Sequence, residues 1–84
     1  MTEVEFDVLD ELYFVQPFDY LVSELELEES EVKQVLISLI EKGWVKCFLN
    51  MQEEALSHEL QLDEKYREYF YLATKAGLMA HNGR

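Results

Sequence analysis

The sequence has few of the residues that break or crosslink a chain: one proline, three glycines and one cysteine among 84 residues. The lone thiol of Cys47 excludes an internal disulfide and suits a reducing compartment. Three separated glycines do not make a phosphate-binding loop. No stretch reaches the roughly 18 uncharged apolar residues of a membrane span, and residues 1–5 are acidic where a signal peptide is basic. We therefore expect a soluble, cytoplasmic protein with no membrane partner.

Positive charge is also scarce, with 7 Lys and Arg against 18 Asp and Glu and a net charge of −11. The imbalance is concentrated in residues 1–31, which hold eleven acidic residues and no Lys or Arg. A surface of this sign repels phosphate. The composition therefore disfavours nucleic acid as a partner.

Apolar residues, in contrast, are plentiful. They make up 49% of the chain and aromatic residues 13%, which is too much for a disordered segment. The length accommodates one small hydrophobic core. We expect residues 1–84 to form a single domain.

Helical periodicity and capping signals predict three helices in the first half. Thr2 and Glu5 have the spacing of a capping box, which predicts a helix over about 3–14. Pro17 interrupts this helix and is suited to the first turn of another, over about 17–25. Apolar residues at helical spacing predict a third helix over about 28–42, with Gly43 as its stop.

The second half alternates β-forming and polar segments. Residues 44–50 and 68–73 are rich in β-branched and aromatic residues and predict an antiparallel pair. Residues 51–67 between them form an arm that is longer than an ordinary hairpin loop, and either a helical turn or a long hairpin fits its sequence. Its apolar residues are spaced as if part of the arm packs on its own domain or on a second copy. Thr74 is a suitable cap for a last helix over about 74–81.

Two stretches resemble the winged helix-turn-helix superfamily, in particular small bacterial regulators. The first is YLVSELELEESEV at 20–32, continued by apolar residues of the third helix and by IEKGWV at 40–45. The second is YFYLATKAGL at 69–78, with a Leu-x-Thr-x-x-Gly pattern at Leu72, Thr74 and Gly77. The resemblance covers nearly the whole chain. It implies an α+β fold with a three-helix core, a two- to three-stranded antiparallel wing and a short C-terminal helix.

In DNA-binding members of this superfamily the third helix enters the major groove and the wing touches phosphate. The resemblance implies that the partner-facing or DNA-facing residues of the third helix are Glu29, Ser30, Lys33, Gln34, Ile37 and Ser38. It implies that those of the wing and arm are Lys46, Lys65 and Arg67.

The residues at these positions are poorly suited to DNA. Glu28, Glu29 and Glu31 crowd the start of the third helix, where a DNA reader presents amides to phosphate. The same acids also complement the helix dipole, so helix stability is the simpler explanation of their role. An aliphatic Ile37 contacts little on DNA except thymine methyl groups. It fits a protein partner, or it packs against the wing.

Catalytic residues are few. Glu54 and His58 would share one face if the arm were helical, but no third metal ligand is evident. Cys47 lies in a predicted strand, where a buried thiol is the simpler interpretation. We expect no enzyme activity, no metal and no cofactor.

The leading hypothesis is a winged-helix module that acts through protein contacts, as a homodimer or by docking to a regulatory partner. The alternative is a DNA-binding transcriptional regulator whose residues form one local patch despite the net charge: Lys33, Gln34, Lys42, Lys46, Lys65 and Arg67. A third hypothesis is an acidic DNA mimic, based on residues 1–31.

Overall fold

The first helix begins at a capping box. A computed structural model describes the backbone of residues 1–83 and every side chain among them except that of Ser57. In α1 (Glu3–Glu11) the Glu5 amide donates to Thr2 Oγ1 over 3.1 Å, and the Thr2 amide donates to Glu5 Oε1 over 2.9 Å. The Thr2 hydroxyl and the Glu5 carboxylate thus accept from amides that have no carbonyl partner within the helix. The predicted start of this helix is correct.

The predicted end of this helix at residue 14 was wrong, because α1 stops at Glu11. The chain then turns to form β1 (Gln16–Pro17), which pairs antiparallel with β3 (Phe70–Ala73). The Leu12 carbonyl accepts a hydrogen bond from the Ala73 amide, which joins the end of α1 to β3. No pattern in the sequence indicated β1, since two residues are too few for a strand pattern and proline is tolerated only at a sheet edge.

The next two helices agree with the periodicity to within a residue at each end. They are α2 (Phe18–Leu25) and α3 (Glu29–Glu41). After α3, Gly43 takes a φ of +77°, and the amides of Gly43 and Trp44 donate to the carbonyls of Ile40 and Leu39. These bonds form a Schellman motif, which favours glycine at the left-handed position. Gly43 ends the helix as predicted.

The sheet has three antiparallel strands in the order β1-β3-β2. In the register, Val45 and Cys47 of β2 (Val45–Phe48) lie opposite Ala73 and Tyr71 of β3. These four residues are buried, whereas the alternate residues are only half buried, so one face of the sheet packs on the helices.

The arm between β2 and β3 contains a 3-10 turn, η1 (Ser57–Glu59), and one helical turn, α4 (Leu62–Lys65). It is therefore neither a continuous helix nor a regular hairpin. Glu54 lies in an isolated bridge with Phe48 instead of a helix, so Glu54 and His58 do not share a helix face.

The last helix, α5 (Lys75–Asn82), is capped by Thr74 as predicted. Thr74 Oγ1 accepts from the Gly77 amide over 3.1 Å and donates to the Gly43 carbonyl over 2.7 Å. The same side chain therefore begins α5 and ties it to the turn after α3.

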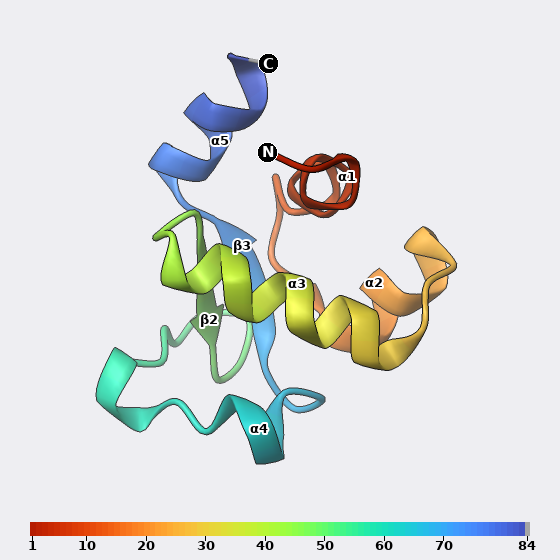
Figure 1. Cartoon of the computed structure of the whole chain (residues 1–84). Helices are drawn as coiled ribbons and strands as arrows, with labels where there is room; N and C mark the ends of the chain where they lie inside the picture. Colours follow the sequence, from red (N-terminus) through yellow and green to blue (C-terminus); the bar gives the residue numbers. More distant parts are fainter. Residues whose placement is uncertain (84) are drawn as a thin grey trace.

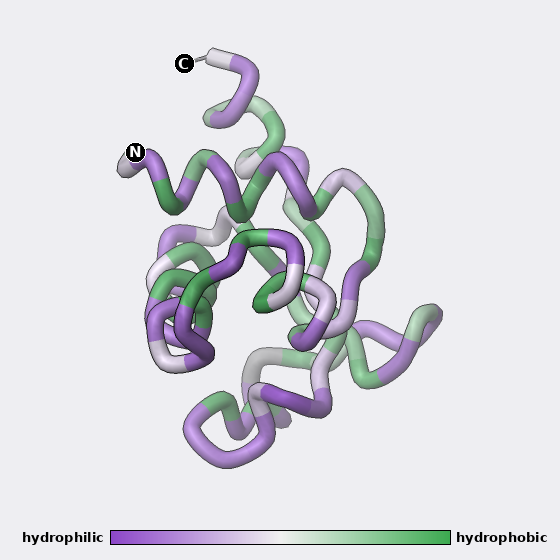
Figure 2. Tube along the Cα trace, turned by 90° about the vertical axis from the view of Figure 1, so that its right-hand side faces the viewer, coloured by the Kyte–Doolittle hydropathy of each residue, from purple (hydrophilic) through white to green (hydrophobic). Residues whose placement is uncertain are grey.

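The helices and the sheet enclose one core. Figure 1 shows α3 crossing in front of β2 and β3, with α1 and α5 near both chain ends and α4 at the opposite end of the molecule. Along the helices, hydrophilic and hydrophobic residues alternate, as expected for amphipathic helices (Figure 2). The fully buried side chains come from α1 and the residue that follows it, from α2 and α3, and from β2 and β3. They include Val8, Leu9, Leu12, Phe18, Leu21, Val32, Leu36, Leu39, Cys47 and Tyr71. The predicted α+β winged-helix arrangement, with a three-stranded sheet, is confirmed.

Candidate functional site

The outer face of α3, where the resemblance places the contact residues, is partly occupied by the arm. Arg67 Nε donates to Glu29 Oε2 over 2.9 Å, and Arg67 Nη2 contacts the same oxygen. Tyr66 donates its hydroxyl to this oxygen over 3.2 Å. The Arg67 guanidinium, with a smaller contribution from Tyr66, holds the pKa of Glu29 below its ordinary value. Glu29 and Arg67, both proposed as contact residues, are therefore used within the chain.

Lys33 makes a second connection one turn further along α3. Its Nζ lies 3.6 Å from Asp63 Oδ1, 3.4 Å from the Asp63 carbonyl oxygen and 4.8 Å from the centre of the Tyr66 ring. An ammonium in this position is held by one carboxylate, one carbonyl and one aromatic face. Lys33 is thus turned toward the arm, and its side chain is only 20% exposed.

The arm is itself anchored in the core at Tyr66. The Tyr66 ring meets that of Phe18 edge to face, with centroids 5.0 Å apart, and the Tyr66 carbonyl accepts from the Tyr71 hydroxyl over 2.8 Å. A further hydrogen bond joins the Gln61 amide to the Tyr69 hydroxyl at 2.9 Å. These contacts to buried residues hold the second half of the arm against α2, α3 and β3.

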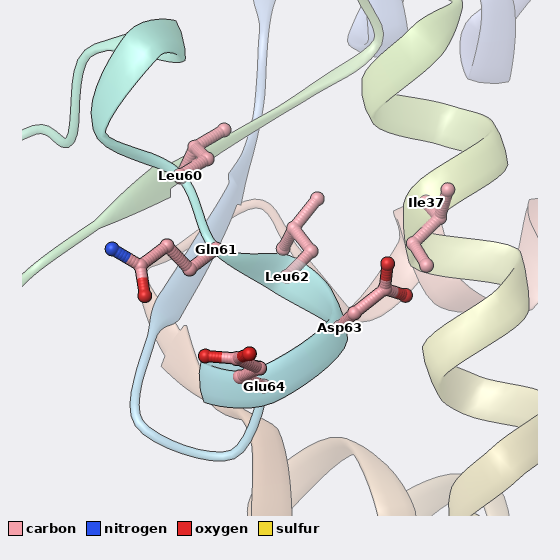
Figure 3. A pocket seen from close by; sticks show the side chains of 6 residues that line it. All are labelled: Ile37, Leu60, Gln61, Leu62, Asp63 and Glu64. Atoms are coloured by element: carbon pink, nitrogen blue, oxygen red, sulfur yellow. The ribbon is translucent and has the colours of Figure 1, made fainter.

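Between α3 and the arm lies a groove of about 500 Å³. We call it the arm groove, and it is lined by Ile37, Leu60, Gln61, Leu62, Asp63 and Glu64. In Figure 3, Ile37 projects from α3 toward Leu62 and Asp63, and Leu60 lies further along the arm. Ile37 is half buried. It therefore packs near the arm and also presents apolar surface to the groove.

The basic residues do not form the free patch that the DNA hypothesis needs. Lys46 Nζ lies 3.5 Å from Glu54 Oε1, and Lys42 Nζ lies 2.6 Å from Glu5 Oε2. With Lys33 and Arg67, four of the six Lys and Arg residues in the described part of the chain are paired with carboxylates. Each pair leaves little net charge for a phosphate.

Lys65 is different, because it forms no ion pair with the residues described. It lines a smaller cavity of about 190 Å³ together with Leu49, Glu59, Glu68 and Tyr69. Two carboxylates in this lining oppose its single charge. Lys65 therefore adds no phosphate-binding surface to the arm.

Ser38 does not lie with the other proposed residues of α3. Its hydroxyl donates to Glu5 Oε2 over 3.4 Å, which turns it toward α1. Glu5 is 5% exposed, and its pKa is lowered chiefly by the Lys42 ammonium and then by the Thr2 amide. Ser38 belongs to this buried network, whereas Ser30 and Gln34 are exposed on α3.

The described residues offer no other reactive site. Burial raises the pKa of the Cys47 thiol to about 12, which keeps it protonated and unreactive. No group of three or more His, Cys, Asp or Glu in the part of the chain that the structure describes has the proximity to hold a metal ion. No helix in that part is both long enough and apolar enough to span a bilayer.

The sequence predicts only part of the arm groove. The spacing of apolar residues in the arm, among them Leu60 and Leu62, predicts packing, and the resemblance implies that Ile37 is a contact residue. No pattern in the sequence singles out Asp63 and Glu64. No local signal indicated that the arm returns to α3, because its contacts join residues 30 to 38 positions apart.

Comparison with known proteins supports the fold and leaves the family open. The chain matches a solved structure described as "Multiple Antibiotic Resistance Repressor, MarR", with a TM-score of 0.76 and 19% sequence identity. The match covers 99% of this chain and 53% of that one, so the chain spans about half the length of that repressor structure. No model of a protein family matches the sequence, and no curated protein matches it. The chain has the winged helix-turn-helix fold.

Proposed function

We propose that this winged-helix domain is a regulatory module that binds a protein partner through the face formed by α3 and the arm. The observation that carries the proposal is that the arm covers part of the helix face that a DNA reader inserts into the major groove. Arg67, Tyr66 and Lys33 hold it there through Glu29 and Asp63. An aliphatic groove remains open beside this contact.

Electrostatics supports the same conclusion. A DNA-binding face gains affinity by releasing counterions as free Lys and Arg residues neutralise phosphates. Here Lys33, Lys46 and Arg67 already face carboxylates of their own chain. Moving them to phosphate would expose those carboxylates beside DNA. Binding to a protein would not require these basic side chains to leave their carboxylates. The winged-helix fold is compatible with either kind of partner, because a fold does not determine function.

A second candidate function, DNA-binding transcriptional regulation, is favoured by the structural similarity to a protein described as a repressor. DNA binding through α3 would require residues 60–67 to leave the helix. A gel-shift assay at about 50 mM salt tests this candidate, because electrostatic binding is strongest at low salt. A shift of labelled duplex by the wild-type protein that is lost in a Gln34→Glu variant would favour DNA binding over protein docking.

The protein-docking proposal is tested by comparing two arginine variants. Gln34 is exposed on α3, and Ser23 is exposed on α2, so Gln34→Arg and Ser23→Arg make similar charge changes on different helices. Partners retained from a lysate of the source are identified by mass spectrometry, and sedimentation velocity measures self-association. We expect a partner, or a dimer, that Gln34→Arg weakens and Ser23→Arg preserves. Equal retention of every protein by both variants, together with a strictly monomeric wild type, would refute docking through α3.

A further inference from the structure

We infer that the arm groove binds a basic amphipathic segment of the partner protein, with apolar side chains inserted between α3 and the arm and Lys or Arg at the edge. This inference rests on the proposed function and specifies the chemistry of the partner. It follows from the apolar lining of the groove, its charge and the anchoring of the arm.

The apolar lining comes from two elements that are far apart in sequence. Ile37 is contributed by α3, and Leu60 and Leu62 by the arm. All three are half buried, so each already packs on the domain and leaves part of its side chain at the groove. Apolar surface in a concave site is removed from water when aliphatic or aromatic side chains fill it.

The charged residues of the groove are all acidic. Asp63 and Glu64 line it, and among the residues that the structure describes no Lys, Arg or His does so. Lys33 pairs with Asp63, yet the Asp63 side chain remains 91% exposed and accessible to a second cation. Glu41, exposed one turn after Ile37 on α3, adds another carboxylate on this side of the helix. Opposite charge at the edge of an apolar site steers the partner and determines which partner fits.

The same charges disfavour other occupants. Nucleic acid and acidic peptides would place negative charge beside Asp63 and Glu64. A second copy of this chain carries a net charge of −11 and meets the same repulsion. A neutral apolar peptide would leave the carboxylates without partners. A basic amphipathic segment satisfies both the apolar lining and the acidic edge.

The groove is also held in shape before binding. The hydrogen bonds from Arg67 and Tyr66 to Glu29, and the Phe18–Tyr66 ring contact, fix the arm on one side of the groove. A preformed site does not lose the entropy of ordering a loop when the partner binds.

The test uses synthetic peptides of about 18 residues that share a leucine face and carry either lysine or glutamate on the other face. Fluorescence anisotropy measures their binding to the whole 84-residue protein, and ¹H–¹⁵N spectra locate the contact. We expect the lysine peptide to bind at least about tenfold more tightly than the glutamate peptide at 50 mM salt, with this difference shrinking as salt rises. The largest amide shifts should fall at Ile37, Leu60 and Leu62.

Two matched charge reversals test whether the lysine peptide binds at the groove or responds only to the net negative charge of the chain. Glu64 lies in α4 and lines the groove, whereas Asp7 is exposed on α1. Figure 1 shows α1 at the other end of the molecule from α4. We expect Glu64→Lys to weaken the lysine peptide by about tenfold and Asp7→Lys to change its affinity by less than about twofold. Ile37→Ala should weaken it at every salt concentration, with the spectrum confirming that the variant is folded.

Three results would overturn the inference: equal binding of both peptides, equal effects of the two charge reversals, or amide shifts confined to residues 1–31. None of them would refute docking through α3, which the comparison of Gln34→Arg with Ser23→Arg decides independently.

Discussion

Replacing Gly77 by alanine tests the packing between the last helix and the turn after α3. A Cβ atom at this position would lie 2.1 Å from the Trp44 carbonyl oxygen and 3.0 Å from its carbon. Both are backbone atoms, so no side-chain rotation relieves the overlap. The same carbonyl accepts the Thr74 amide over 2.9 Å, which fixes its distance from the start of α5.

Two effects of opposite sign compete in this variant. Helix propensity favours alanine over glycine by up to about 1 kcal/mol. Accommodating the methyl group requires α5 to move by roughly 1 Å, which costs about 1–3 kcal/mol in strain and about 1 kcal/mol for the weakened Thr74–Trp44 hydrogen bond. We expect a net loss of about 1–3 kcal/mol, or a fall in Tm of about 5–20 °C for a domain of this size.

Thermal and urea unfolding followed by circular dichroism measure this change, with Ala76→Gly as the control. Ala76 is exposed on α5, so its replacement reports helix propensity without a clash and should cost about 1 kcal/mol or less. The reasoning fails if Gly77→Ala raises Tm, because propensity would then exceed the overlap with Trp44.

Two further predictions concern buried ionisable groups. Because the folded-state pKa of Glu5 lies below its ordinary value of 4.5, its pairing with Lys42 stabilises the fold above that pH and is lost as pH falls below it. Lys42 is 41% exposed, so Lys42→Ala should lower the free energy of unfolding by only about 1 kcal/mol at pH 7. Urea titrations should show this difference shrinking below pH 4.5. A difference that does not change with pH would contradict the pairing of Glu5 with Lys42. Burial raises the pKa of Cys47 to about 12, so Ellman's reagent at pH 8 should label it only after unfolding, and stoichiometric labelling of the native protein within minutes would contradict its burial.

A covered helix face also changes what the winged-helix fold implies for function. The fold accounts for how α3 is presented, and the arm covers part of the outer face of α3. In the function proposed above, the arm would determine which part of α3 a partner reaches. A fold does not by itself determine function, so residues outside the three-helix core have to be considered.

Local signals identified the elements because each depends on residues close in sequence. The Thr2–Glu5 capping box, the glycine stop at Gly43 and the Thr74 cap all operate within a few residues of the chain. They predicted where α1 and α5 begin and where α3 ends. Their spacing is sufficient because the hydrogen bonds involved are made within one turn.

Elements that depend on distant partners were not predicted. β1 exists because it pairs with β3, more than fifty residues later, and α1 ends early for the same reason. Ser38 turns inward because Glu5 is buried beneath it. Helical periodicity places such residues on a face but does not show which neighbour covers that face.

Short-range patterns in the sequence were therefore enough to predict α1, α2, α3 and α5, the β2–β3 pair, a single core and the surplus of acidic charge. The return of the arm to α3, and the pairing of Glu29 with Arg67 and of Lys33 with Asp63, depend on tertiary packing. An ion pair between residues 30 or more positions apart forms only after the core has placed both elements. Within the acidic segment 1–31, Glu5 and Glu29 pair with Lys42 and Arg67, whereas the acidic edge of the arm groove comes from Asp63 and Glu64, later in the chain.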